Sequence, residues 1–258
     1  MFNLFAAKCP VGEDDRLWIE NRFGWLIKEF GIENLLENSV ILPTDEFFPD
    51  VYQARESDVY SLLERVCDYL DVDLSQIELK FYDDARETVR HGLPFYESGH
   101  KSAAAGYFQA SQTKHTVGIN TSQLKNPLSL VATIAHELGH VRLLGDERIS
   151  ADEKDHEPLT DLLTVYYGLG IFTANSSFQF SQYTNSFSQG WSAKRLGYLS
   201  EEMFGYALGL YAWMRDEQNA EWSKHLSINV RSFFKDSCRY LQKNQNEISA
   251  ELRKIAVR

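Results

Sequence analysis

Apolar residues recur at helical spacing along most of the chain. The first run covers 14–30, and Gly31 ends it. A second run follows the Ser-Asp pair at 57–58, which is suited to cap a helix. Ser200 precedes a third run with two glutamates in its first turn, and a last helix is expected over 219–243. These patterns predict a mostly helical protein.

Three segments lack helical periodicity. Residues 42–52 hold two prolines and are expected to be extended, and 83–99 is rich in charge, glycine and proline and is expected to be a loop. Residues 172–190 are rich in Ser, Asn, Gln and Phe. We interpret this last segment as a non-helical connection, either a loop over a functional site or a plain connector.

Short strands are expected only in the middle of the chain. Segments 103–109 and 115–120 read as two strands with a turn at 111–114, and 76–82 alternates apolar and polar residues like a third. The small residues of 103–106 would leave a sheet edge accessible to an extended ligand. The alternative is an ordinary hairpin packed under a helix.

Taken together, these elements predict an α+β fold that is mostly helical, with a small, mainly antiparallel sheet. We expect a mainly helical region over 1–75, a core region with the sheet over 76–175, and a helical region over 176–258. The three regions could also form one compact domain, since 258 residues can bury a large common core.

The helix that follows the strands has clear boundaries. Asn126 is a preferred N-cap, and Pro127 is tolerated at the first helical position. From 128 to 144 only Gly139 disfavours a helix, and Gly145 supplies a stop. Projected on a helix, four polar residues share one narrow side of an otherwise apolar surface: Ser129, Thr133, His136 and His140.

This helix carries the sequence His136-Glu137-Leu138-Gly139-His140. Imidazoles four residues apart stand on one helix face and can reach a single metal ion. Glu137 points about 100° round the helix, where it can hold a metal-bound water rather than the metal. The alternative is a pair of core histidines that are satisfied by neighbours, which leaves the adjacent glutamate unexplained.

A catalytic zinc ion commonly has a third protein ligand, often a glutamate. Glu157 and Asp161 are one turn apart on an expected second helix, and sixteen residues separate His140 from Glu157. We expect Glu157 to bind metal and Asp161 to accept the N–H of a ligand imidazole. His156 is the rival third ligand, and a charged helix start is the structural alternative. Weaker ligand candidates are Asp152, Glu153 and Asp155.

His136-Glu137-x-x-His140 followed by Glu157-x-x-x-Asp161 resembles the gluzincin zinc metallopeptidases, the clan that includes thermolysin. The similarity covers about 103–174, with a shorter gap between the motifs than in thermolysin and with Pro158 directly after Glu157. It implies a zincin-like fold with a small sheet beside the active-site helix, and one Zn²⁺ per chain.

The resemblance also implies a mechanism. Zinc would activate a water, and Glu137 would act as general base and then deliver the proton to the leaving amine. The oxyanion would need one further donor, which relatives in this clan take from a Tyr or His after the second motif. The sequence offers several and does not choose among them: Tyr198, Tyr206, His225 and, less favoured, Arg195.

Composition and charge limit the partners and the cellular location that we expect for this protein. The net charge of -11 argues against non-specific binding to nucleic acid or to anionic membranes. No signal peptide and no membrane-spanning stretch is recognisable, so a cytoplasmic protein is expected. Cys9, Cys67 and Cys238 are widely spaced and are interpreted as reduced thiols.

The leading hypothesis is a soluble zinc metallopeptidase that acts on peptides or on a protein substrate. A zinc hydrolase of a non-peptide amide or ester would share all these residues. A non-catalytic zinc-binding regulatory protein is the third hypothesis, and the intact Glu137 speaks against it. No oligomeric state is predicted.

Overall fold

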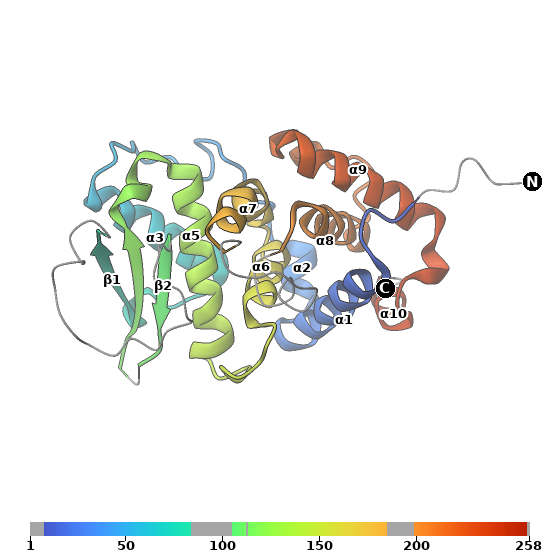
Figure 1. Ribbon diagram of the computed structural model, residues 1–258, viewed down its shortest axis with the longest axis horizontal. Coiled ribbons are helices and arrows are strands. Elements are labelled where there is room, and N and C mark those ends of the chain that lie inside the picture. Colours follow the sequence, from blue (N-terminus) through green and yellow to red (C-terminus); the bar gives the residue numbers. More distant parts are fainter. Residues whose placement is uncertain (1–7, 84–104, 112, 185–198, 257–258) are drawn as a thin grey trace, which may run out of the picture.

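The structure is a computed structural model that describes residues 8–83, 105–111, 113–184 and 199–256. In these ranges the chain is mostly helical with one small sheet, so the expected α+β class is confirmed (Figure 1). The sheet and α5 lie towards one end of the molecule, and α1, α8, α9 and α10 lie towards the other.

The α-helices of the described residues are α1 (Glu13–Phe30), α2 (Ile32–Glu37), α3 (Glu56–Leu70), α5 (Pro127–His140), α6 (His156–Tyr166), α7 (Gly170–Thr184), α8 (Glu201–Met214), α9 (Ile228–Lys243) and α10 (Ala250–Ala256). The strands are β1 (Ile77–Tyr82), β2 (Gly106–Gln109) and β3 (His115–Asn120). Short helical turns are η1 (Leu74–Gln76), η2 (Thr121–Lys125), η3 (Val141–Gly145), η5 (Glu221–His225) and η6 (Gln245–Glu247).

The sheet has the order β1-β3-β2 and is mixed, so the expectation of a mainly antiparallel sheet was wrong. β2 and β3 are separated by five residues and run antiparallel, with Gly106 opposite Ile119. β1 runs parallel to β3, with Ile77 opposite His115. More than thirty residues separate β1 from β3, which is enough chain for the crossover that a parallel pair requires.

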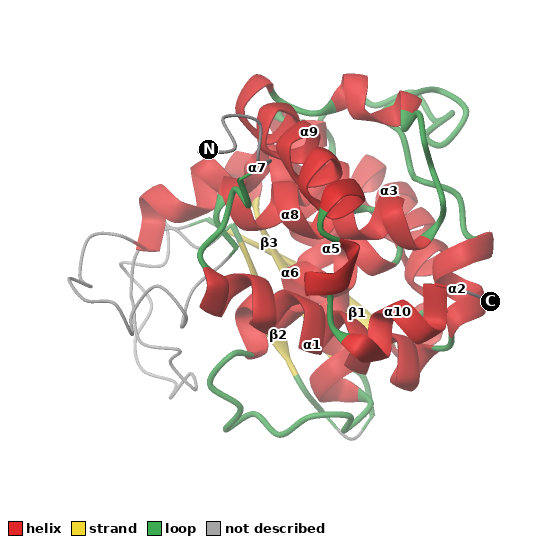
Figure 2. Ribbon diagram, turned by 90° about the vertical axis from the view of Figure 1, so that its right-hand side faces the viewer, coloured by secondary structure: helices red, strands yellow, loops and turns green. Residues whose placement is uncertain are grey.

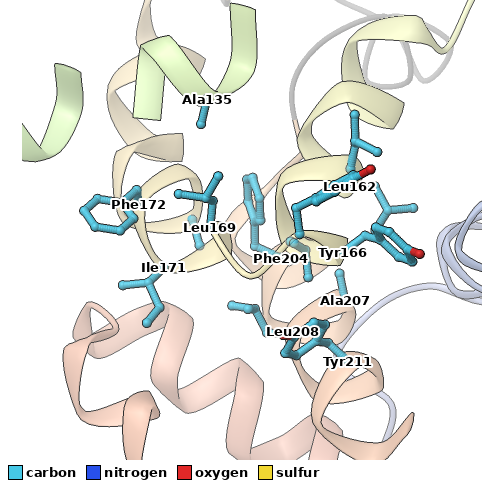
Figure 3. Close-up of a cluster of buried hydrophobic side chains, with 14 of the residues drawn as sticks. Ala135, Leu162, Tyr166, Leu169, Ile171, Phe172, Phe204, Ala207, Leu208 and Tyr211 are labelled. Atoms are coloured by element: carbon cyan, nitrogen blue, oxygen red, sulfur yellow. The ribbon is translucent and has the colours of Figure 1, made fainter. Parts of the chain in front are cut away.

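Helix α5 lies between the sheet and the helical part of the molecule, where it contacts α3, α6 and α7 (Figure 1). Gly139 lets α6 approach closely, because a Cβ added there would lie 2.7 Å from Cγ2 of Thr160. Figure 3 shows the core beyond α6, where aromatic and aliphatic side chains of α6, α7 and α8 interlock. Four side chains on α8 are buried in this core: Phe204, Leu208, Tyr211 and Ala212.

Two helix predictions need correction. α7 is a helix where a non-helical connection was expected over 172–190, of which 185–190 lie outside the described residues. Ile171, Phe172 and Ala174 are buried in the core, so tertiary packing outweighs the weak helix propensity of the Ser- and Asn-rich sequence. The single helix expected over 219–243 is instead η5 followed by α9.

The break before α9 is held by Asn175 of α7. Its side-chain amide donates to the carbonyl of His225 at 2.9 Å and accepts the backbone N–H of Ser227 at 2.7 Å. Other expected elements are present: α1 ends at Gly31, which adopts a φ of 88°, and 42–52 holds neither helix nor strand. Of the expected loop over 83–99, residues 84–99 lie outside the described residues.

Buried hydrophobic side chains from all three predicted regions belong to one core cluster. None of the three cysteines forms a disulfide. Within the described residues, no helix combines the length and the apolar character needed to cross a bilayer.

Candidate metal centre

The two histidines project from one side of α5. The Asn126 side chain accepts the backbone N–H of Ser129 at 3.3 Å, and Pro127 opens the helix, as the sequence predicted. His136 and His140 are both buried. The α-helical hydrogen bonding ends at His140, and the chain continues as one π-helical turn, η3, to the expected stop at Gly145. Such turns are frequent at functional sites.

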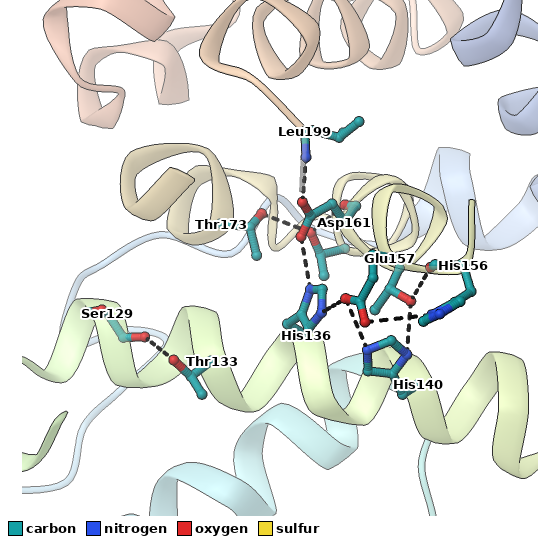
Figure 4. A network of polar contacts seen from close by, with 11 residues as sticks. Ser129, Thr133, His136, His140, His156, Glu157, Asp161, Thr173 and Leu199 are labelled. Atoms are coloured by element: carbon teal, nitrogen blue, oxygen red, sulfur yellow. Dashed lines mark hydrogen bonds and ion pairs between the residues drawn. The ribbon is translucent and has the colours of Figure 1, made fainter. Parts of the chain in front are cut away.

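Glu157 arrives from the first turn of α6 and faces both imidazoles (Figure 4). Its Oε2 lies 3.0 Å from Nε2 of His136 and 3.5 Å from Nε2 of His140, and one ligand atom from each of the three residues lies within 4.8 Å of the other two. Ligands at 2.0–2.2 Å from a tetrahedral zinc ion are roughly 3.4 Å apart. The three side chains therefore form a group that could hold a metal ion of this kind.

Asp161 orients the ring of His136 from one turn further along α6. Its Oδ1 lies 2.9 Å from Nδ1 of His136, and its Oδ2 accepts the backbone N–H of Leu199 at 2.9 Å. An ionised carboxylate can only accept, so Nδ1 of His136 carries a hydrogen, and Nε2 is the nitrogen that can offer a lone pair to a metal ion once its own proton is lost. The sequence predicted this contact, but it did not predict the one to Leu199.

Thr160 orients the ring of His140 in the same way, and the sequence did not predict this contact. Its hydroxyl donates to the carbonyl of His156 at 2.7 Å, so it accepts from Nδ1 of His140 at 3.2 Å. Nε2 of His140 thus also faces Glu157 and is the nitrogen that could bind a metal ion. The sequence holds a feature that could have indicated this contact, because Thr160 lies three residues after Glu157 and directly before Asp161.

The charges in this group favour a cation between the side chains. Burial lowers the pKa of His136, but its hydrogen bonds to Asp161 and Glu157 outweigh burial and raise the pKa well above its usual range. Burial raises the pKa of Glu157, but the charges and hydrogen bonds of the two histidines bring it well below its usual range. A divalent cation could replace the proton that His136 holds between two carboxylates.

Glu137 lies beside this group without belonging to it. It is buried on α5, and burial raises the pKa of its carboxyl, which is the direction that favours a general base at neutral pH. Strand β2 packs against it: a Cβ on Gly106 would lie 2.9 Å from Oε1 of Glu137. Two residues along, the ring of Phe108 stacks on the ring of His140 at 5.9 Å.

The rival ligands lie elsewhere. Nδ1 of His156 is buried, has no hydrogen-bond partner among the described residues and lies 3.6 Å from Oε1 of Glu157, outside the three-residue group. Burial lowers the pKa of this histidine. Asp155 and Glu153 form ion pairs with Arg22 of α1, and Asp152 is exposed. The structure therefore places Glu157 alone of these residues with His136 and His140.

The expected oxyanion donors are not brought to the group in the described residues. Tyr206 is buried, and its hydroxyl donates to Oε1 of Glu20 at 2.7 Å, between α8 and α1. His225 lies in η5, where its carbonyl accepts from Asn175. Tyr198 and Arg195 lie outside the described residues.

Replacing Asp161 by Asn should weaken zinc binding by about 10- to 100-fold, the usual effect of removing a partner of a ligand histidine. Asp161 accepts from two donors with two oxygens, whereas an Asn has one oxygen and would turn its NH₂ towards either His136 or Leu199. Competition with a chromophoric chelator measures the affinity. Asp45→Asn on the exposed surface is the control, and equal affinities for both variants would contradict the expectation.

Comparisons with known proteins add no family to this description. No family model matches the chain, no curated protein matches it, and no solved structure matches it. A function can therefore be inferred only from the geometry and chemistry of the site.

Proposed function

We propose that this protein is a zinc-dependent hydrolase that cleaves peptide bonds. The observation that carries the proposal is the convergence of two imidazole nitrogens and one carboxylate oxygen on one point, with a second carboxylate beside them. Three protein ligands with two His and one Glu are typical of catalytic rather than structural zinc sites. The resemblance to the gluzincins rests on the same residues, and a zincin-like fold is part of the proposal.

In this mechanism His136, His140 and Glu157 would hold the ion, and Asp161 and Thr160 orient the two imidazoles through their Nδ1 atoms. The ion, when bound, supplies Lewis acidity and lowers the pKa of water. Glu137 takes the proton of the attacking water and passes it to the nitrogen of the leaving amine. Its raised pKa suits both steps.

The neighbouring strand favours a peptide over a small amide. β2 pairs with β3 alone among the described strands, and Gly106 and Phe108 on it contact Glu137 and His140. An extended peptide could add to the other edge of β2 through backbone hydrogen bonds and so bring a peptide bond to Glu137.

The proposal is tested by elemental analysis together with a library of fluorogenic peptides. We expect one zinc ion per chain, and peptide cleavage that stops with a chelator and returns with added zinc. Protein that binds no transition metal would overturn the proposal. Turnover of small amides or esters without any peptide cleavage would favour the non-peptide hydrolase, and zinc-loaded but inert protein would favour a regulatory role.

Replacing Gly106 by Ala should lower kcat by about tenfold or more without releasing zinc. The added Cβ would lie 2.6 Å from Cγ2 of Thr133 and 2.9 Å from Oε1 of Glu137, so the carboxylate must move. A displacement of about 1 Å at a catalytic group can reduce turnover by up to roughly 100-fold. Gly12→Ala is the matched control, because its nearest neighbour would be 3.8 Å away. Unchanged kcat in Gly106→Ala would contradict the expectation.

A further inference from the structure

Asp155 occupies the N-cap position of α6 but does not cap the helix. Aspartate is favoured at this position because its carboxylate accepts an N–H that would otherwise lack a partner in the first turn. In this structure the Asp155 side chain makes no such hydrogen bond. Both of its oxygens are turned instead towards α1.

Three hydrogen bonds join Asp155 to α1. Arg22 donates from Nε to Oδ2 at 2.8 Å and from Nη2 to Oδ1 at 2.7 Å, and Trp18 donates from Nε1 to Oδ2 at 2.7 Å. The donors lie one turn apart on α1. The Arg22 and Asp155 side chains are about four-fifths buried, which protects the pair from solvent screening. Two-point pairing of a guanidinium with a carboxylate fixes direction as well as distance.

Asp155 is the N-cap residue of α6, and Glu157 follows two residues later in the first turn of that helix. We infer that this clamp of Trp18, Arg22 and Asp155 is a positioning device for the third metal ligand. It fixes where α6 begins, and it thereby holds the Glu157 carboxylate against the two imidazoles of α5. The inference rests on the proposed zinc site, and it makes α1 part of the metal centre although α1 precedes the motif by more than a hundred residues.

The clamp differs from the general packing of α1 on α6. Aromatic packing between these helices lies at the far end of α6, where Tyr166 packs edge-on against Phe23 and its hydroxyl donates to the carbonyl of Gly31. Those contacts are untouched when Arg22 is changed. The loss of the clamp should therefore loosen the first turn of α6 while the two helices stay packed together.

The test measures zinc affinity by competition with a chromophoric chelator, using the full chain at a temperature at which every variant is folded. Arg22→Met keeps the aliphatic stem and removes all donors, and we expect about tenfold weaker zinc binding. Trp18→Phe removes a single donor and keeps an aromatic ring, and we expect a smaller loss of about twofold to threefold. This milder variant keeps the test valid if Arg22→Met folds poorly.

Two controls separate positioning from general stability. Arg65→Met makes the same chemical change at a more exposed ion pair, with Asp50 at 2.8 Å, that involves neither α1 nor α6. Val230→Ala removes buried volume in α9 and lowers the thermal unfolding midpoint of the metal-free protein without touching the clamp. Zinc affinity should be unchanged in both. Zinc binding that weakens in Val230→Ala as much as in Arg22→Met would overturn the inference.

A double-mutant cycle completes the test. If Arg22 acts through Asp155, Asp155→Asn in the Arg22→Met background should weaken zinc binding no further. If the wild-type protein binds zinc and both Arg22→Met and Trp18→Phe bind it with the same affinity, the inference about the clamp is wrong and the proposed function still stands. Wild-type protein that binds no zinc would overturn the proposed function, and the clamp's role would fall with it.

Discussion

Replacing Glu137 by Gln should lower kcat for a peptide substrate by about 10²- to 10⁴-fold, the usual contribution of a general base. The amide has nearly the same size but cannot take a proton from water. Zinc should stay bound, because Glu137 is not among the three residues whose ligand atoms converge. Steady-state kinetics on a fluorogenic peptide, with zinc content measured on the same preparation, check both parts of the prediction.

Glu64→Gln is the control for this variant. Glu64 is exposed on α3, so the same chemical change there should leave kcat unaltered. Hydrolysis at the wild-type rate by zinc-loaded Glu137→Gln would eliminate Glu137 as the base. Loss of zinc from that variant would instead place Glu137 among the ligands.

Replacing Glu157 by Gln should weaken zinc binding by at least about 100-fold. Structural zinc sites with four ligands bind with roughly 10–16 kcal/mol, so one ligand accounts for about 3 kcal/mol, and every 1.4 kcal/mol is tenfold in affinity. The change also leaves the buried His136 with one carboxylate partner instead of two. Zinc titration against a competing chelator measures the loss.

The matched variant is His156→Gln, because His156 is the rival third ligand and precedes Glu157 directly. Its Nδ1 lies outside the ligand group, so this change should leave zinc affinity within about threefold of the wild-type value. The reverse result, with zinc lost in His156→Gln and kept in Glu157→Gln, would assign the third ligand to His156.

Several features of this site follow from local sequence alone. The spacing of His136 and His140 on a capped, otherwise apolar helix places both imidazoles on one face, because four residues make about one helical turn. The same periodicity sets Glu137 beside them and Asp161 one turn beyond Glu157. These relations need only the helical state, so they could be read before any packing was known.

The prediction for 172–190 was wrong because it used composition alone, whereas the structure of this segment depends on packing. Its Ser and Asn residues are weak helix formers, and α7 forms because Ile171 and Phe172 are buried in the core. The direction of β1 was likewise not visible in its alternating pattern, which is the same for parallel and antiparallel neighbours. Pairing direction depends on where the long connection brings the chain back.

The His136-Glu137-x-x-His140 motif by itself predicted a metal site on α5, and the tertiary structure decided which other residues complete that site. Among the acidic residues of 152–157, the structure turns Asp155 to Arg22 and Glu157 to the histidines. The sequence favoured Glu157 as the ligand because Asp161 follows it by one helical turn, but it did not show what Asp155 contacts. Their roles differ because α6 packs against both α1 and α5, and contacts between segments so distant in the chain arise only when the core packs.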